Sequence, residues 1–222
     1  MTNIRGVVGQ LQYPLQSEGG FVNARMNPRG ELVTPDYFLQ LVLDGNVYNA
    51  SNLVQETPER ISETARGSDN VNPSLLLDVP TGTTAIPLEI NIEEAAGTTE
   101  DLTLTINTDD VVRRTSGGAT ITPVNMRKDD RNTAESTFYS GSTQIVTIVN
   151  VDDDQLYTRF IEAEATPRTT VGNRPIFSWS ARDFVPPVLI GPASLLVFLI
   201  GSTDDHDWFY SVKWAEIATT HI

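Results

Sequence analysis

The chain has no cysteine and only two histidines, His206 and His221, among its 222 residues. Without cysteine it forms neither disulfides nor thiolate metal sites, and a cysteine nucleophile is excluded. A serine–histidine–acid site would have to use His206, because His221 is next to the last residue of the sequence. The Gly-x-Ser-x-Gly elbow, the Walker A loop and the Gly-x-Gly-x-x-Gly fingerprint are also missing. We therefore expect a protein that is not an enzyme and carries no cofactor.

The chain also has few positively charged residues: 15 Lys and Arg against 29 Asp and Glu, which gives a net charge of -14. Nucleic acids are bound by neutralising their phosphates with Lys and Arg, so we expect no nucleic-acid partner. Acidity of this kind keeps a chain soluble, and it also suits a partner with a basic patch.

Long apolar runs are missing as well. The longest, residues 188–200, is interrupted by Gly191, Pro192 and Ser194, and it is shorter than the about 20 residues that a bilayer span needs. The first residues hold no apolar core of a signal peptide. We expect a soluble protein without a membrane partner, made in a cytoplasm.

The sequence is rich in patterns typical of β-strands. Ile86, Leu88, Ile90 and Ile92 alternate with mostly polar residues, and 102–106 repeats the pattern. Side chains of a strand alternate between its two faces, so each run predicts one apolar face. The turn-like segment between them predicts that the two runs form a hairpin with one solvent-facing side.

Three other runs are apolar without alternation. Residues 145–149 and 195–200 predict central strands that are covered on both faces, or strands that a neighbouring subunit covers. Residues 37–43 predict a shorter strand, and Asp44-Gly45-Asn46 predicts the hairpin turn after it. The 15 Gly and 13 Pro are spread along the chain, as in a protein of many short strands. We expect an all-β fold.

The composition suggests three regions. Residues 1–52 are rich in polar turns and predict an extended N-terminal arm. Residues 53–73 predict a linker or short helix, in which Thr57 would be the N-cap and Gly67 the stop. Residues 74–222 predict the β-sandwich itself.

Acidic clusters are the best candidates for metal ligands. Asp204, Asp205, His206 and Asp207 lie between two strand-like runs, and the runs Asp152–Asp154 and Asp109–Asp110 are placed similarly. Carboxylates and imidazole bind cations, but the spacing of a calcium loop is absent. We interpret these clusters as solvated loops and expect no metal.

Aromatic residues gather near the C-terminus. Trp208, Tyr210 and Trp214 fall on one face of a strand together with Val212, and Phe177 and Trp179 share a face of another. Aromatic side chains carry large burial energies in cores and in interfaces alike. These five aromatic residues are therefore candidates for the core, for an interface with a subunit or partner, or for a platform that stacks on sugars.

Several stretches in this order resemble virion proteins of tailed bacteriophages, specifically the small jelly-roll proteins that decorate or cement the capsid, often as trimers. The stretches that carry the resemblance are Gly30–Thr34, Gly45–Ser51, Pro80–Leu88, Ile121–Arg127, Pro187–Phe198 and Lys213–Ile217. The resemblance implies a jelly-roll-like antiparallel β-sandwich and brings no catalytic residue with it.

The resemblance also implies a function. We expect a structural virion protein on the capsid surface that binds the major capsid protein, stabilises the shell and assembles as a homotrimer. The alternative is a tail-associated β-sandwich that binds a receptor or host glycans, for which the aromatic faces would supply the site. A hydrolase that uses paired acids is a third hypothesis, which the missing motifs disfavour.

Overall fold

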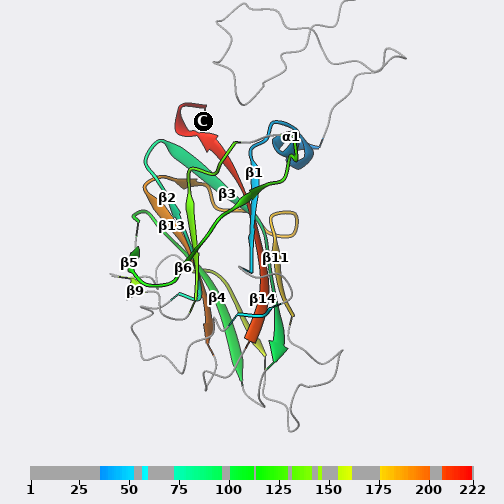
Figure 1. The fold of residues 1–222 in the computed structure, drawn as a ribbon, viewed down its shortest axis with the longest axis vertical. Helices are drawn as coiled ribbons and strands as arrows, with labels where there is room; N and C mark the ends of the chain where they lie inside the picture. The colour runs from blue at the N-terminus through cyan, green and yellow to red at the C-terminus, as the bar shows by residue number, and fades with distance from the viewer. Residues whose placement is uncertain are drawn as a thin grey trace, which may run out of the picture.

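Most strands of the described residues form two antiparallel sheets packed face to face (Figure 1). The structure, a computed structural model, describes residues 36–52, 57–59, 73–96, 101–112, 114–129, 132–141, 145–146, 155–161, 176–200 and 207–221. Within these ranges the helical elements are α1 (Tyr37–Leu43) and the 3-10 turn η2 (Thr219–His221). The prediction of an all-β sandwich is confirmed.

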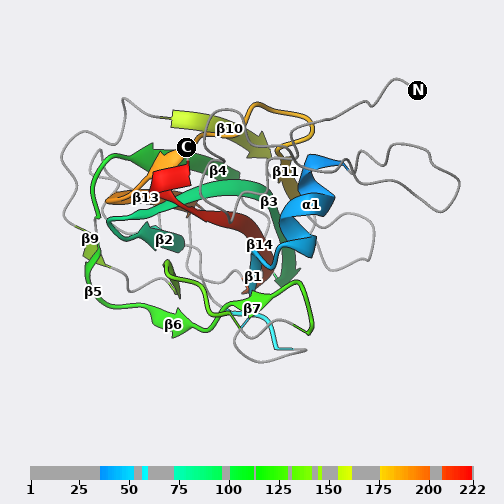
Figure 2. The ribbon, with the colours of Figure 1, turned by 90° about the horizontal axis from the view of Figure 1, so that it is seen from above.

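The first sheet contains, in spatial order, β11 (Ile176–Ser180), β3 (Thr83–Ala96), β14 (Asp207–Ala218), β1 (Val47–Ser51) and β7 (Val124–Asn125), with β12 (Leu189–Ile190) also paired to β3. The second contains β10 (Gln155–Ile161), β4 (Leu102–Asp109), β13 (Ala193–Ile200), β2 (Leu75–Val79), β8 (Thr137–Ser140) and β6 (Ala119–Ile121). A separate pair is formed by β5 (Arg114–Ser116) and β9 (Ile145–Val146). Figure 2 shows the layers from above.

The order in which the chain visits the two sheets is that of a jelly roll. In the first sheet β1, β14, β3 and β11 are neighbours, and in the second β2, β13, β4 and β10 are neighbours. Strands joined along the chain therefore occupy matching positions in opposite sheets, as in the eight-stranded double Greek key. The segment between β4 and β10 adds β6, β7 and β8 beyond β1 and β2. The predicted jelly-roll-like sandwich is confirmed.

The predicted hairpin of residues 86–92 with 102–106 is wrong, because β3 and β4 belong to different sheets. The single apolar face is confirmed for residues 102–106, where Leu102, Leu104 and Ile106 are buried, but it is wrong for residues 86–92. Leu88 is an extra residue between the pairs Pro87–Trp214 and Glu89–Lys213, and such a bulge reverses the faces of the residues that follow it. Ile90 and Ile92 consequently enter the core between the sheets, whereas Ile86 and Leu88 pack on the outer face.

Residues 37–43 form the helix α1 instead of the predicted strand. Asp36 accepts a hydrogen bond from the Phe38 amide at 2.8 Å as the N-cap. At the other end Gly45, with φ 74°, donates to the Val42 carbonyl, and the Asn46 amide donates to the Leu41 carbonyl. These two bonds form a Schellman motif, so Asp44-Gly45 ends a helix and is not a hairpin turn. An apolar run of seven residues is compatible with a strand or a helix, and here the capping residues at its two ends determine that it is a helix.

The predicted boundary of the N-terminal arm at residue 52 is also corrected. Strand β1 pairs with β14 over its whole length and with β7 on its other side, so the sandwich includes residues 47–51. Residues 1–35 and 60–67 lie outside the described residues. Of the predicted helix start, Thr57–Glu59 is described, and Glu59 forms an antiparallel bridge with Trp208.

Of the two runs predicted as central strands, one is confirmed. Strand β13 lies between β4 and β2, and its residues Ala193–Leu199 are buried on both faces. The outward-facing Leu196 and Phe198 pack with Leu76 and Tyr139. Ile145–Val146 instead pairs only with β5 among the described strands, so it is not central in the sandwich; residues 147–149 lie outside the description.

Candidate functional site

The five aromatic residues singled out in the sequence are all buried in the core of one chain. Phe177, Trp208 and Trp214 have no exposed surface, and Trp179 and Tyr210 are exposed by 4% or less. The Trp214 ring stacks on Phe138 of the opposite sheet with ring centroids 5.9 Å apart. The regular alternation of β14 and β11 was predicted correctly, but their aromatic faces point between the sheets and form no exposed platform.

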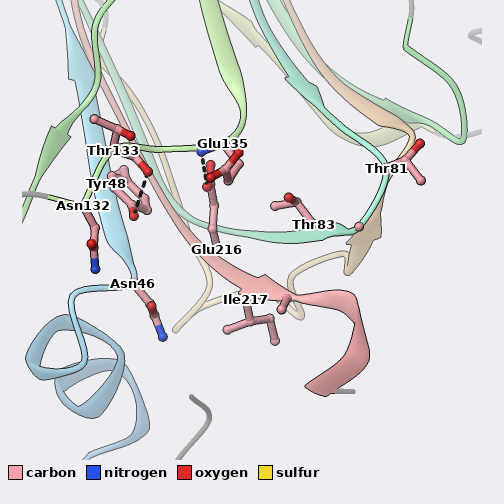
Figure 3. A pocket seen from close by; sticks show the side chains of 11 residues that line it. Asn46, Tyr48, Thr81, Thr83, Asn132, Thr133, Glu135, Glu216 and Ile217 are labelled. Carbon is pink, nitrogen blue, oxygen red and sulfur yellow. Dashed lines mark hydrogen bonds between the residues drawn. The ribbon is translucent and has the colours of Figure 1, made fainter. Parts of the chain in front are cut away.

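A polar cleft lies where β14 ends, beside the C-terminal turn (Figure 3). Its volume is about 550 Å³, within the range of small-molecule sites. Four segments that are distant in sequence form it: the start of β1, the turn before β3, the segment before β8 and the end of β14. The residues that line it are Asn46, Tyr48, Thr81, Gly82, Thr83, Asn132, Thr133, Glu135, Glu216, Ile217 and Ala218.

The Glu216 carboxylate fixes one wall of this cleft. Oε1 accepts hydrogen bonds from the Trp214 indole N–H at 2.7 Å and from the Ser136 amide at 3.1 Å, and Oε2 accepts from the Glu135 amide at 2.8 Å. Three donors thus satisfy a carboxylate that is only 6% exposed. Because both oxygens are engaged, Glu216 acts as a clamp for the segment before β8 rather than as an acid or base.

The turn on the opposite wall is held by backbone hydrogen bonds. The Thr83 amide donates to the Pro80 carbonyl at 3.2 Å, the Thr219 amide to Gly82 at 2.9 Å, and the Gly191 amide to Thr83 at 2.9 Å. Both walls are therefore fixed within the folded chain, and the cleft is formed before any ligand arrives.

Side chains with unused hydrogen-bonding capacity face this cleft. Within the described part of the chain, the side chains of Thr81, Thr83, Thr133 and Glu135 make no hydrogen bond or ion pair with protein groups. Each threonine hydroxyl can both donate and accept, and the Glu135 carboxylate accepts. The sequence offered no signal for this site, because the lining comes from isolated polar residues with no motif spacing.

The acidic clusters predicted as solvated loops have mixed outcomes. Asp109 is in β4 and is buried next to Ser194 of β13, so it is not in a loop; Asp110 is exposed. Asp207 begins β14, whereas Asp204–His206 and Asp152–Asp154 lie outside the described residues. In the ranges that are described, no three His, Asp or Glu side chains gather as a metal-binding group.

A second polar cluster joins residues 57–59 to the sandwich near the beginning of β14. The Glu59 Oε2 atom accepts from the Tyr210 hydroxyl and from the Ser140 hydroxyl, each at 3.0 Å. Asn52 adds its side chain, which accepts from the Tyr210 amide at 2.7 Å. Burial and, to a lesser extent, the Glu59 charge raise the pKa of the Tyr210 phenol far above its usual value of 10.0.

Tyr210→Phe should make the chain less sensitive to alkali. In the unfolded state Tyr210 releases its proton near pH 10, whereas in the folded state it keeps it, so its contribution is complete below pH 10 and falls above that value. The free energy of unfolding of the unsubstituted chain should therefore fall above about pH 10 more steeply than that of Tyr210→Phe, by up to about 1.4 kcal/mol per pH unit. Urea unfolding at a series of pH values measures this, with the exposed Tyr37→Phe as the control; equal slopes for all three chains would contradict it.

Comparison of the chain with protein-family models, with curated proteins and with solved structures finds no match. Among the described residues, no helix has the length and apolar character needed to cross a membrane. The function is therefore inferred from the surface and from the polar cleft.

Proposed function

We propose that the chain is a non-catalytic virion protein of a tailed bacteriophage that decorates and stabilises the capsid as a homotrimer bound to the major capsid protein. The sequence resemblance supports this, and so does the strand order, since jelly rolls are frequent among virus shell proteins. A fold hosts many functions, however. The observation that carries the proposal is a group of exposed apolar side chains around α1.

We call this group the α1 patch: Tyr37, Leu39, Phe184, Val185, Val188 and Ile190. All six are about half exposed or more, and Val185 is 94% exposed. Helix α1 covers the outer face of the first sheet, where Leu41 packs with Val47 and Ala215 (Figure 2).

The turn after β11, which carries Phe184 and Val185, approaches the helix through Arg182. Arg182 in this turn lies over the Phe38 ring, 5.5 Å from its centre, and 3.6 Å from the Asp36 carboxylate. Ile190 faces outward beside β3, because its neighbour Leu189 enters the core.

Apolar patches of this kind, rimmed by charges, are typical of sites that bind other proteins. The exposed Asp36, Arg182 and Asp183 border the α1 patch. The net charge of -14 disfavours contact with packaged nucleic acid and favours a partner with basic groups around an apolar centre. For the alternative of a glycan-binding tail module, the aromatic side chains do not supply the site, because they are buried.

The double variant Val185→Ser/Ile190→Ser should weaken binding to purified shells of the virus that encodes the chain by at least about tenfold, which corresponds to about 1.4 kcal/mol. Both side chains are exposed, so the fold should be unaffected. Co-sedimentation with the shells measures binding, and circular dichroism reports the fold.

Val124→Ser/Ile176→Ser is the matched control, since it makes the same changes at exposed positions outside the α1 patch. It should bind shells normally. Unchanged binding of the patch variant, or equal loss in both variants, would argue against the α1 patch, and a stable monomer in light scattering would argue against the trimer.

A further inference from the structure

The polar cleft at the end of β14 has a chemistry that selects among ligand classes. Among the residues that the structure describes, the lining contains no lysine or arginine, and two of its residues are the carboxylates Glu135 and Glu216. Anionic ligands such as phosphates are therefore disfavoured, because no described lining residue offsets their charge. Metal ions are also disfavoured, because the Glu216 oxygens already accept three hydrogen bonds from N–H donors, and Glu135 is the one other carboxylate among the described lining residues.

Apolar ligands fit poorly for the opposite reason. Hydroxyl, amide and carboxylate groups line most of the cleft, and burying them under an apolar molecule would remove water without replacing its hydrogen bonds. The aliphatic part of the lining is small and consists of Ile217, seen in Figure 3, and its neighbour Ala218. A ligand with many hydroxyl groups and one C–H face matches both parts.

We infer that the polar cleft binds a neutral, polyhydroxylated ligand of the sugar class. Thr81, Thr83 and Thr133 supply hydroxyls that can each donate to and accept from a sugar hydroxyl, and Glu135 accepts from a further one. Gly82 leaves the centre of its turn open, since a Cβ placed there would meet no atom within 4 Å. This binding is independent of the α1 patch and goes beyond the proposed attachment to a shell.

Preorganisation strengthens the inference. The segment that carries Thr133 and Glu135 is fixed by the Glu216 clamp and by the Asn125 side chain, which donates to the Gly45 carbonyl at 2.8 Å and to the Asn132 carbonyl at 3.4 Å. A ligand therefore pays little ordering entropy for these walls when it binds.

Titration of the full-length, ¹⁵N-labelled chain with glucose, galactose, mannose and N-acetylglucosamine tests the inference by nuclear magnetic resonance. At least one sugar should shift the backbone amides of residues 81–83, 132–136 and 216–218 in a saturable way. Glucuronate, a sugar acid, should bind more weakly than glucose, because its carboxylate meets Glu135.

Thr133→Val/Glu135→Gln should weaken the binding of that sugar by about tenfold or more. The control Thr120→Val/Glu93→Gln makes the same changes at exposed positions outside the cleft and should bind like the original chain. If the first variant fails to fold, Thr81→Val alone provides the same comparison. Absence of saturable shifts with all four sugars, shifts elsewhere on the chain, or binding unaffected by the cleft variants would overturn the inference.

Discussion

Trp214→Ala should lower the free energy of unfolding by about 3–5 kcal/mol, the usual cost of emptying a buried tryptophan site. The Trp214 side chain has no exposed surface and contacts both sheets, stacking on Phe138 with ring planes 13° apart and lying 6.2 Å from the Tyr48 ring. It also donates its indole N–H to Glu216. Urea-induced unfolding followed by circular dichroism measures the loss.

Two controls separate core from interface as the role of Trp214. Trp214→Phe keeps a ring against Phe138 and should cost less than Trp214→Ala, whereas Val124→Ala at an exposed site should change stability by no more than about 0.5 kcal/mol. Light scattering should give the same oligomeric mass for every folded variant. A Trp214→Ala chain of unchanged stability but smaller mass would place this side chain in a subunit interface and contradict its assignment to the core.

Glu216→Ala should cost about 2–4 kcal/mol, because it leaves three N–H donors without an acceptor. The indole of Trp214 and the amides of Glu135 and Ser136 all depend on this one carboxylate. Water from the cleft can reach part of the vacated space, which keeps the cost below that of three fully buried donors. Denaturant unfolding measures the loss.

Hydrogen exchange distinguishes the clamp from a general loss of stability. The amides of Glu135 and Ser136 should exchange faster in Glu216→Ala under conditions where amides of β13 stay protected. Glu93→Ala, at an exposed glutamate of β3, is the control and should change neither quantity. Unaltered protection of Glu135 and Ser136 would show that Glu216 does not hold this segment.

Most sheet-forming segments could be predicted from the sequence, because the alternation of apolar and polar residues and continuous apolar runs are local properties. The prediction failed where contacts between residues distant in the sequence determine which strands pair and which side chains face the core. Apolar residues alternate without interruption over residues 86–92, yet the bulge at Leu88 places some of them in the core between the sheets and others in the apolar cluster on the outer face. A proline within a strand is most often found at an edge or a bulge, so Pro87 was the available signal.

The helix α1 was missed for a different reason. Its seven apolar-rich residues have no clear period, and the turn residues Asp44 and Gly45 suit a hairpin and a Schellman motif equally well. Asp36 before the run was the one helix signal in the sequence. The α1 patch depends on this helix, so it too was unpredicted.

The candidate site was beyond prediction from the sequence. The aromatic period of β14 identified a buried face, but period alone does not say whether the same chain or another copy covers it. The polar cleft brings together residues near 46, 82, 133 and 217, which only the sandwich topology places side by side.

Imaging intact virions at a resolution that traces this chain tests whether it decorates the capsid. We expect three copies of the sandwich together on the outer surface of the capsid, with the α1 patch, including Val185 and Ile190, against the shell or a neighbouring copy. Virions that carry the chain only on the tail, or on the capsid with the α1 patch facing solvent, would contradict it.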